Sequence, residues 1–277
     1  TYEILAVIRF LEYFEKYDFS VSSYKRYIKF VEQLKIKSEF GMQAFKLEPF
    51  QCFLVANLWG WKDSDGTNLI KDALFFVPRK ASKSSLIAQL AIYGLLFGPP
   101  DAQIYCSSNS FNQSKIIFDI ITASVKSIDP TMRSFRRTRD KIYSVIQDRD
   151  SFIQCLSCSP DRLDGLNAYI NIFDELSQAK DFKVKQALES SQGARKNYLN
   201  IAITTASTNI NGPFTTYLAN HKKVLEGEIE NDNLFSVIFE AEDNDDISSP
   251  NVWNKVQPMM GIAVNEKYYY TQYKKAI

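Results

Sequence analysis

The sequence predicts an α/β fold in which a mainly parallel central sheet is flanked by helices. Residues 72–90 read as a buried strand, a short polar loop and an amphipathic helix. Residues 103–107 and 111–128 repeat this order of strand and helix, and residues 169–173 and 199–203 have the composition of further buried strands. Strands that alternate with helices imply parallel pairing through crossover connections.

The composition fits one large domain, or a main domain with a small appendage. The chain has 277 residues, and its 33 Lys and Arg residues are balanced by 32 Asp and Glu residues. Any contact with nucleic acid must therefore come from a local patch of charge. The 4 cysteines include one C-x-x-C pair, Cys155 and Cys158, but with 1 histidine they form no zinc pattern, so we expect reduced thiols. No apolar run or leader pattern indicates a membrane segment or a signal peptide, and we expect no membrane partner.

Residues 1–44 read as an N-terminal helical portion. Apolar and aromatic side chains recur at helical spacing in residues 2–16 and 22–34, and Ser22 is placed to cap the second helix. We expect both helices to pack on a larger body.

Gln51 follows Phe50 at the start of an apolar run that ends at Trp61. Its side chain offers one acceptor and two donors, which can pair with the N6 amino group and N7 of an adenine, while Phe50 can pack on the ring. A surface glutamine at the start of a helix explains the same residues without a ligand. Both interpretations stay open at this point.

The polar loop within residues 72–90 has the chemistry of a phosphate-binding loop. In such loops, backbone N–H groups and a helix N-terminus surround a polyphosphate, a lysine reaches its terminal oxygens, and the next Ser or Thr binds Mg²⁺. Lys83 and Ser84 fit these roles. The usual pattern has glycine where this chain has Val77 and Ser82, so we expect modest strain at Ser82 or a variant loop path. A buried strand followed by a basic surface turn is the alternative.

Asp174 and Glu175 follow the apolar run 169–173. The carboxyl ends of strands are where α/β sheets bind ligands. Asp174 can hold Mg²⁺, usually through water, and Glu175 can orient and polarise an attacking water. The next strand ends in hydroxyl-bearing residues that can sense a γ-phosphate, although a turn rich in Ser and Thr is the alternative. The hydroxyls belong to Thr204, Thr205 and Ser207, and Ala206 completes the stretch.

Short strands and a basic cluster follow the helix at 111–128. Residues 141–147 and 151–158 predict a hairpin or adjacent antiparallel strands. We interpret the basic cluster before them either as a solvated loop or as a contact to DNA phosphate or to the nucleotide of a neighbouring subunit. The cluster consists of Arg133, Arg136, Arg137, Arg139 and Lys141.

Taken in order, these motifs resemble those of the large subunit of tailed-phage terminases, the ATPase that drives DNA into an empty capsid. The resemblance covers residues 45–277. It rests on segments similar to that family's adenine motif, its variant Walker A loop, its Walker B strand and several later motifs. They are LEPFQ at 47–51, VPRKASKS at 77–84, QSK at 113–115, LDGLN at 163–167, IFDEL at 172–176, GAR at 193–195, TTA at 204–206, SPNVW at 249–253 and PMMG at 258–261.

The resemblance implies a role for each matched residue. Lys83 would contact the β- and γ-phosphates, while Ser84 and the Walker B acid Asp174 would hold Mg²⁺. Glu175 would be the catalytic acid, and Arg79 would stabilise the γ-phosphate from within the same subunit. Further implied nucleotide contacts are Gln51, Lys80, Ser82 and Ser85, and the implied motif that couples hydrolysis to DNA movement is Thr204, Thr205, Ala206 and Ser207. Ser82 and Ser207 depart from the glycines that are common in the family.

We therefore expect an additional-strand P-loop ATPase that binds ATP and Mg²⁺. Its parts would be the helical portion 1–44, an ATPase core at 45–209, and a lid or linker at 210–277 that leads to a nuclease domain absent from this chain. A ring of subunits docked on the portal would advance double-stranded DNA into a procapsid in the host cytoplasm, together with a small terminase subunit. Arg137 or Arg139 would supply an arginine to the neighbouring subunit or contact DNA.

Two alternatives remain at this stage. One is a weakly active nucleotide-binding scaffold that docks the small terminase subunit or the portal. The pair Asp174 and Glu175 argues against it, because a scaffold needs no acid that polarises water. The other is a helicase-like DNA translocase, for which we find no strand-separation motif.

Overall fold

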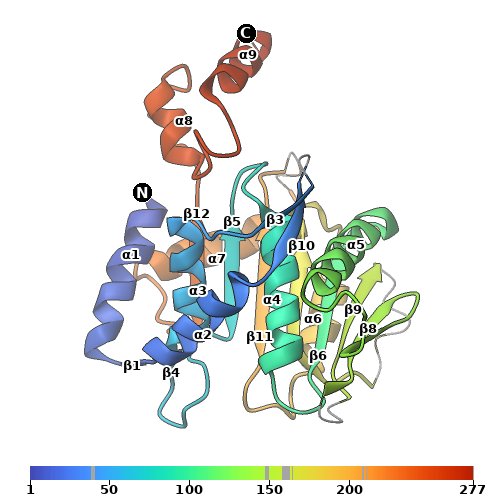
Figure 1. Cartoon of the computed structure of the whole chain (residues 1–277). Coiled ribbons are helices and arrows are strands. Elements are labelled where there is room, and N and C mark those ends of the chain that lie inside the picture. Colours follow the sequence, from blue (N-terminus) through green and yellow to red (C-terminus); the bar gives the residue numbers. More distant parts are fainter. Residues whose placement is uncertain are drawn as a thin grey trace.

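An 8-stranded sheet organises the molecule, with the strand order β12-β5-β11-β10-β6-β9-β8-β7 (Figure 1). The computed structural model describes residues 1–38, 41–146, 150–157, 163, 165–207, 209 and 211–276. The strands of this sheet are β5 (Asp72–Phe76), β6 (Gln103–Ser108), β7 (Phe135–Arg137), β8 (Lys141–Ser144), β9 (Phe152–Ser157), β10 (Ala168–Asp174), β11 (Leu199–Thr204) and β12 (Leu234–Ile238).

The sheet is mainly parallel, which confirms the predicted fold class. From β12 to β9, every neighbouring pair of strands is parallel. β8 is antiparallel to both β7 and β9, as expected for the short strands beyond residue 141. β11 lies between β5 and β10 and is the additional strand of the expected fold.

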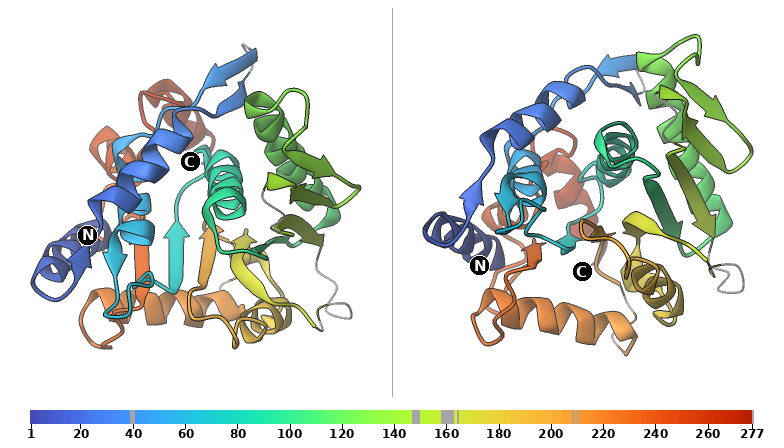
Figure 2. Two further views of the ribbon diagram at one scale, coloured as in Figure 1. Left: turned by 60° about the horizontal axis from the view of Figure 1, so that its bottom comes forward. Right: turned by 90° about the horizontal axis from the view of Figure 1, so that it is seen from below.

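Helices cover both faces of the sheet. α4 (Lys83–Phe97) and α5 (Phe111–Ile128) pack on one face, while α6 (Lys183–Ser190) and α7 (Pro213–Leu225) pack on the other (Figure 2). α4 is buried over its whole middle, from Leu86 to Leu95, because it lies between the sheet and the helices α5 and α2 (Val21–Val31), and α3 (Pro49–Gly60) packs on α2. A helix with apolar residues on all sides is stable only in such a position.

The N-terminal helical portion packs on the edge of the sheet at β12. α1 (Tyr2–Glu12) contacts β12 and α7, and β1 (Asp18–Phe19) pairs with β4 (Trp61–Lys62). The short strands β2 (Lys35–Ser38) and β3 (Gly41–Ala44) follow α2. The predicted cap of α2 is wrong, since Ser20 has the extended backbone of a cap and accepts the Ser23 N–H at 3.2 Å.

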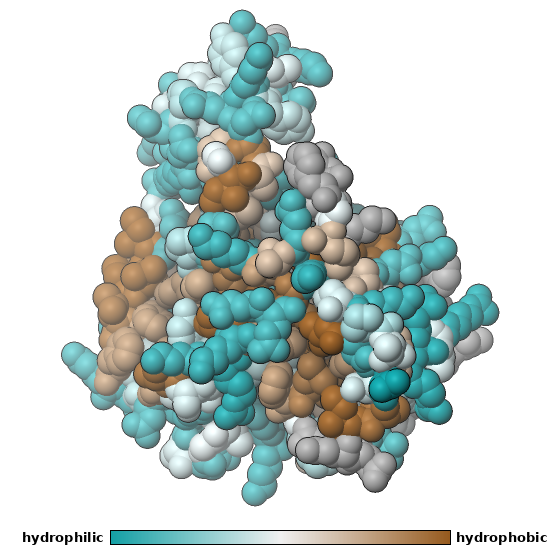
Figure 3. Space-filling model, viewed as in Figure 1, coloured by the Kyte–Doolittle hydropathy of each residue, from teal (hydrophilic) through white to brown (hydrophobic). Residues whose placement is uncertain are grey.

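The outer face of α1 is apolar and exposed. Figure 3 shows this surface in brown at the left of the molecule, where Figure 1 places α1. Large apolar side chains recur at helical spacing on this exposed face. α1 therefore has an apolar face towards solvent as well as the apolar face that packs on the sheet. The exposed side chains are Ile4, Val7, Ile8 and Leu11 of α1, with Phe14 in the short 3-10 helix that follows.

The expected boundary near residue 210 falls within the sheet. Residue 210 itself lies outside the described residues, but α7 and the 5-residue strand β12 follow it, and β12 pairs with β5. Beyond them, α8 (Pro250–Val256) and α9 (Glu266–Ala276) form a helical hairpin above the carboxyl ends of the strands (Figure 1). We propose that the ATPase core extends to about Ile238 and that the lid begins after it.

Other sequence expectations concern membranes, metals and thiols. No described helix combines the length and the apolar character needed to cross a bilayer. In the described part of the chain, no cluster of three or more His, Cys, Asp or Glu side chains could hold a metal ion. Cys52, Cys106 and Cys155 are free thiols, while Cys158 lies outside the described residues.

Candidate active site

The sheet brings the candidate residues to one edge. The phosphate loop, residues 77–82, joins the carboxyl end of β5 to α4, and Asp174 and Thr204 end β10 and β11. In the strand register, Asp174 lies opposite Ile203, and Thr204 lies opposite Phe76. The three strands therefore end at nearly the same level, as expected for a ligand site at the carboxyl edge.

The phosphate loop contains two residues with left-handed backbone, Lys80 at φ 69° and Ser82 at φ 56°. The strain expected at Ser82 is thus present, because side chains disfavour this conformation. No side chain caps the start of α4. Backbone N–H groups in the first turn, which begins with Lys83, Ser84 and Ser85, remain available to an anion.

We expect Ser82→Gly to raise the free energy of unfolding by about 0.5–1 kcal/mol, because glycine adopts the left-handed conformation without steric cost. Ser85→Gly is the matched control, since Ser85 lies in the regular helix α4. There glycine should lower the free energy of unfolding by about 0.5 kcal/mol. Urea denaturation measures both variants, and the reverse order of stabilities would contradict the assigned strain.

Lys83 and Glu175 form an ion pair at the centre of the site, through Lys83 Nζ and Glu175 Oε1. Their side chains are only 12% and 16% exposed. The other oxygen of Glu175 accepts hydrogen bonds from the Thr205 N–H at 3.3 Å and the Thr205 hydroxyl at 3.1 Å. Thr204 Oγ1 lies 3.5 Å from the same oxygen. The structure therefore brings together residues from the loop, β10 and β11 that the sequence singled out separately.

Asn109 is a site residue that the sequence analysis missed. It follows β6, and its Nδ2 donates to the main-chain oxygen of Glu175 at 2.6 Å. The Glu175 N–H donates to the Ile203 oxygen at 2.9 Å. These two bonds hold Glu175 in a left-handed conformation, with φ 54°. The sequence signal that could have identified Asn109 is its position directly after a buried strand, where the chain becomes polar.

Asp174 lies beside this ion pair and lines a cavity of about 370 Å³ together with Asn109 and Lys185. Burial raises the pKa of Asp174 to about 6, with a further contribution from the charge of Glu175, while Lys83 acts in the opposite direction. Asp174 and Ser84 offer the oxygen ligands that Mg²⁺ prefers. A cation next to Asp174 would also relieve the unfavourable burial of its carboxylate.

This burial predicts a pH dependence of stability. The pKa of Asp174 is raised in the folded state from 3.8 to about 6, so stability falls as the pH rises through that interval. Without metal, we expect Asp174→Asn to raise the free energy of unfolding near pH 8 by about 1–3 kcal/mol and to have little effect near pH 4. Asp181→Asn, at an exposed carboxylate of the same cavity, should show no such difference. Equal effects of Asp174→Asn at both pH values would contradict the burial argument.

Gln51 is not at the surface, and its side-chain oxygen is not free to pair with an adenine. It is 1% exposed, and its Oε1 accepts the Glu48 N–H at 3.0 Å in a capping box at the start of α3. Its Nε2 has no partner among the described residues. The surface interpretation is therefore wrong, and only the donor side of the amide is left without a partner among the described residues.

An apolar cavity of about 320 Å³ is lined by Ile4 and Val7 of α1 on one side and by residues that include Phe50 and Phe239 on the other. The Phe239 N–H donates to the Phe76 oxygen at 2.9 Å, which places Phe239 beside the start of the phosphate loop. The Phe50 and Phe239 rings meet edge to face, with centroids 6.0 Å apart. The cavity has an aromatic lining next to the loop.

The arginines of the basic cluster differ in their contacts. Arg137 packs on α5, with its guanidinium 5.0 Å from the Phe118 ring centre and 3.9 Å from the Asp119 carboxylate. Arg139 lies in the turn between β7 and β8, is exposed, and makes no hydrogen bond or ion pair with any residue that the structure describes. Only Arg139 of these two is therefore available to another molecule without breaking contacts.

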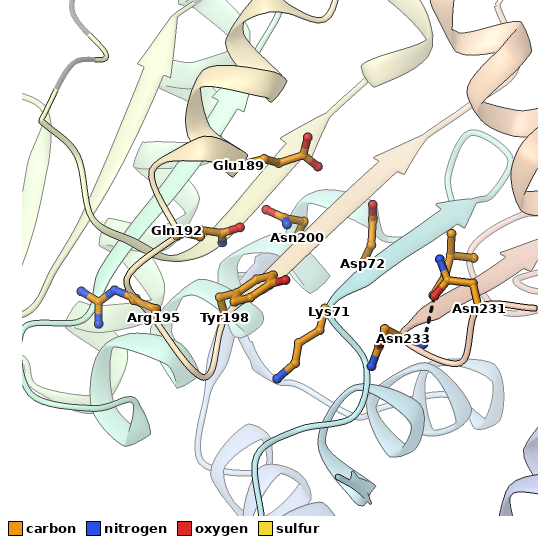
Figure 4. A pocket seen from close by; sticks show the side chains of 11 residues that line it. Lys71, Asp72, Glu189, Gln192, Arg195, Tyr198, Asn200, Asn231 and Asn233 are labelled. Carbon is orange, nitrogen blue, oxygen red and sulfur yellow. Dashed lines mark hydrogen bonds between the residues drawn. The ribbon is translucent and has the colours of Figure 1, made fainter. Parts of the chain in front are cut away.

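A larger cavity, of about 540 Å³, lies at the opposite edge of the sheet (Figure 4). Its lining includes Asp72, Asn200 and Leu234, which lie at the amino ends of β5, β11 and β12. Gln192 also lines it, is 2% exposed, and has no partner for its amide among the described residues. This cavity is separated from the phosphate loop by the length of the strands, so it is not part of the candidate active site.

Residues 49–223 match the model of a protein family described as the terminase large subunit, ATPase domain. The large terminase subunit of Enterobacteria phage HK97 is 26% identical over 262 residues, which are 91% of this chain and 49% of that protein. Protein YmfN of Escherichia coli K12 is 30% identical over 113 residues, 41% of this chain and 25% of that protein. The chain thus spans half or less of the length of these curated relatives.

Solved structures show the same fold. The crystal structure of the HK97 large terminase has a TM-score of 0.78 at 24% identity, and the match covers 91% of this chain and 51% of that one. The ATPase domain of the large terminase of Thermus phage P74-26 has a TM-score of 0.51 at 16% identity, with coverage of 75% and 84%. Similarity at these identities concerns the arrangement of helices and strands.

Proposed function

The chain belongs to the ATPase-domain family of terminase large subunits, and from this we propose that its carboxyl-edge site hydrolyses ATP to move double-stranded DNA. Membership of the family makes the chain a nucleotide-binding ATPase domain. The observation that carries the proposal is the ion pair of Lys83, at the start of α4, with Glu175, which follows β10. A cation for phosphate and an acid for water are the groups that phosphoryl transfer needs.

Each residue of the site has a task in this proposal. When nucleotide binds, Lys83 leaves Glu175 and contacts the β- and γ-phosphates. Backbone N–H groups of the first turn of α4 bind the same phosphates. Ser84 and Asp174 hold Mg²⁺, which when bound neutralises charge on the phosphates. Glu175, released by Lys83 and still held by Thr205, orients the attacking water and accepts its proton.

Other loop residues complete the phosphate site. We assign to the exposed side chain of Arg79 the neutralisation of the γ-phosphate from the same subunit, and to Lys80, Ser82 and Ser85 further contacts with the phosphates. Thr204, Thr205, Ala206 and Ser207 link the site to the next segment of the core. We propose that this stretch transmits hydrolysis to DNA movement, because Thr204 and Thr205 already contact Glu175.

The base is proposed to lie against Phe50 and Phe239, in the apolar cavity beside the loop. The Gln51 Nε2 would donate to N7 of an adenine, since its oxygen is already used by the Glu48 N–H. Recognition through both N6 and N7, which the sequence suggested, would require the capping box to open.

Arg139 is proposed to act on the nucleotide of a neighbouring subunit. β7 is separated from β5 by the strands β11, β10, β6, β9 and β8. At about 4.8 Å per strand, the β7–β8 turn lies roughly 29 Å from its own phosphate loop, beyond the reach of an arginine. Since β7 runs in the same direction as β9, this turn points towards the carboxyl edge, where a neighbour's nucleotide would be met.

We expect Arg139→Ala to lower ATP turnover of the assembled protein by about 10³-fold, because a guanidinium stabilises charge in the transition state. Arg137→Ala should leave turnover much closer to the wild type. Mixing Arg139→Ala subunits with Lys83→Ala subunits should restore turnover, since the latter can lend Arg139 to an intact loop. No restoration in the mixture, or equal losses for both arginines, would contradict the assignment.

The wider function is that of a packaging motor. We propose that a ring of these subunits docks on the portal of a procapsid in the host cytoplasm, with a small terminase subunit as a further partner. ATP turnover of the chain, with and without double-stranded DNA, tests the proposal. Turnover that DNA accelerates supports the motor, whereas a chain that neither binds nor hydrolyses ATP would instead fit a scaffold.

A further inference from the structure

Gln257 connects the helical hairpin of α8 and α9 to the phosphate loop. It follows α8 and is 1% exposed. Its Nε2 donates to the main-chain oxygen of Arg79 at 3.0 Å and to the Tyr269 hydroxyl at 3.2 Å. Its Oε1 accepts the Met259 N–H at 3.2 Å. These bonds use the acceptor and both donors of the amide, so its orientation is fixed.

The orientation of the Arg79 carbonyl affects the conformation of the phosphate loop. The next residue, Lys80, has φ 69°, and Ser82 has φ 56°. The Arg79 C=O and the Lys80 N–H belong to one planar peptide, so a bond that fixes the carbonyl also fixes the direction of this N–H in the loop. The side chains of Arg79 and Lys80 are exposed and cannot anchor the loop by packing.

The segment that carries Gln257 is held in place by buried neighbours. Met259 is 5% exposed and belongs to the main apolar core. Trp253 of α8 is 6% exposed, and its Nε1 donates to the Ile247 oxygen at 2.7 Å. Gln257 therefore presents its amide to the loop from a segment that packs on the core.

We propose that Gln257 is a positioning residue of the nucleotide site, whose amide holds the Arg79–Lys80 peptide in the orientation that binds phosphate. The inference rests on the proposed binding of nucleotide at this loop. Because coupling is reciprocal, bound nucleotide also strengthens the docking of the hairpin on the loop. Gln257 would thus tie phosphate binding to the position of α8 and α9.

The test compares substitutions of similar shape. Gln257→Glu keeps the length of the side chain but turns an acceptor towards the Arg79 carbonyl. We expect it to raise the dissociation constant of Mg-ADP, measured by titration calorimetry, about tenfold or more. Gln257→Met removes the amide without adding charge and serves as the second variant. Hydrogen exchange of residues 250–276 should slow on ADP binding in the wild type and not in Gln257→Glu.

Two control variants separate positioning from general docking of the hairpin. Tyr269→Phe keeps the bond from Gln257 to Arg79, and Asn254→Ala removes another amide of the hairpin, which donates to the Pro250 oxygen at 2.9 Å. Both should leave the dissociation constant unchanged. Equal weakening by Gln257→Glu and Tyr269→Phe would overturn the inference, as would unchanged affinity in folded Gln257→Glu or Gln257→Met. A wild-type chain that does not bind ADP contradicts the proposed function itself, so the two failures are distinguishable.

Discussion

Glu175→Gln is expected to bind ATP and to hydrolyse it about 10²–10⁴ times more slowly than the wild type, the range that general base catalysis contributes. The amide cannot accept the proton of the attacking water. ATP affinity should be equal or higher, because the substitution removes the carboxylate that holds Lys83. Single-turnover kinetics and equilibrium binding of ATP measure the two effects separately.

Glu189→Gln is the matched control for this prediction. Glu189 is also a partly buried glutamate paired with a lysine, Lys185, but the pair lies on α6 outside the phosphate loop. Its substitution should leave kcat unchanged. If Glu175→Gln turned over ATP at the wild-type rate, water activation would have to be assigned to another group.

Lys83→Ala is expected to weaken ATP binding by about 10²-fold or more, because the charge-assisted bonds to the phosphates are lost. It should also destabilise the protein without nucleotide by about 1–3 kcal/mol, since the Glu175 carboxylate loses its partner while 16% exposed. Equilibrium binding and urea denaturation measure the two consequences.

Lys222→Ala is the control for the loss of a lysine. It removes the ion pair between Lys222 and Glu240, whose side chains are 25% and 26% exposed, without touching the loop. ATP affinity should not change in this variant. Wild-type affinity in Lys83→Ala would remove the loop from the proposed site.

The sequence predicted the central elements well where local pattern decides them. The helix at 111–128 has the bounds that were expected, because Ser110 caps it and Asp129 with Pro130 closes it. The strand expected at 169–173 is one residue longer at each end in the structure, and the strand expected at 199–203 is one residue longer at its carboxyl end. The apolar pattern of such buried strands is local information.

The boundary of the core was harder to predict. β12 has the sequence LFSVI, and its membership of the sheet depends on pairing with β5 in a distant part of the chain. Local pattern does not reveal such pairing. A turn-rich stretch near residue 210 therefore looked like the end of the core, although the sheet gains another strand beyond it.

Contacts between distant residues account for what was missed at the site. Asn109 and Glu175 are 66 residues apart, and Gln257 and Arg79 are 178 apart. Lys83 and Glu175 were singled out for separate roles, but their ion pair spans 92 residues and appears only in the folded chain. The capping box of Gln51 was readable in principle, since Glu48 precedes Gln51 by three residues at a helix start.

A crystal structure of this chain with Mg²⁺ and a non-hydrolysable ATP analogue tests the central claim most directly. We predict that the triphosphate lies against the phosphate loop and the first turn of α4, with Lys83 moved from Glu175 to the phosphates and the metal held by Ser84 and Asp174. A nucleotide bound elsewhere, for example in the cavity beside Gln192, with the pair of Lys83 and Glu175 intact, would contradict the account.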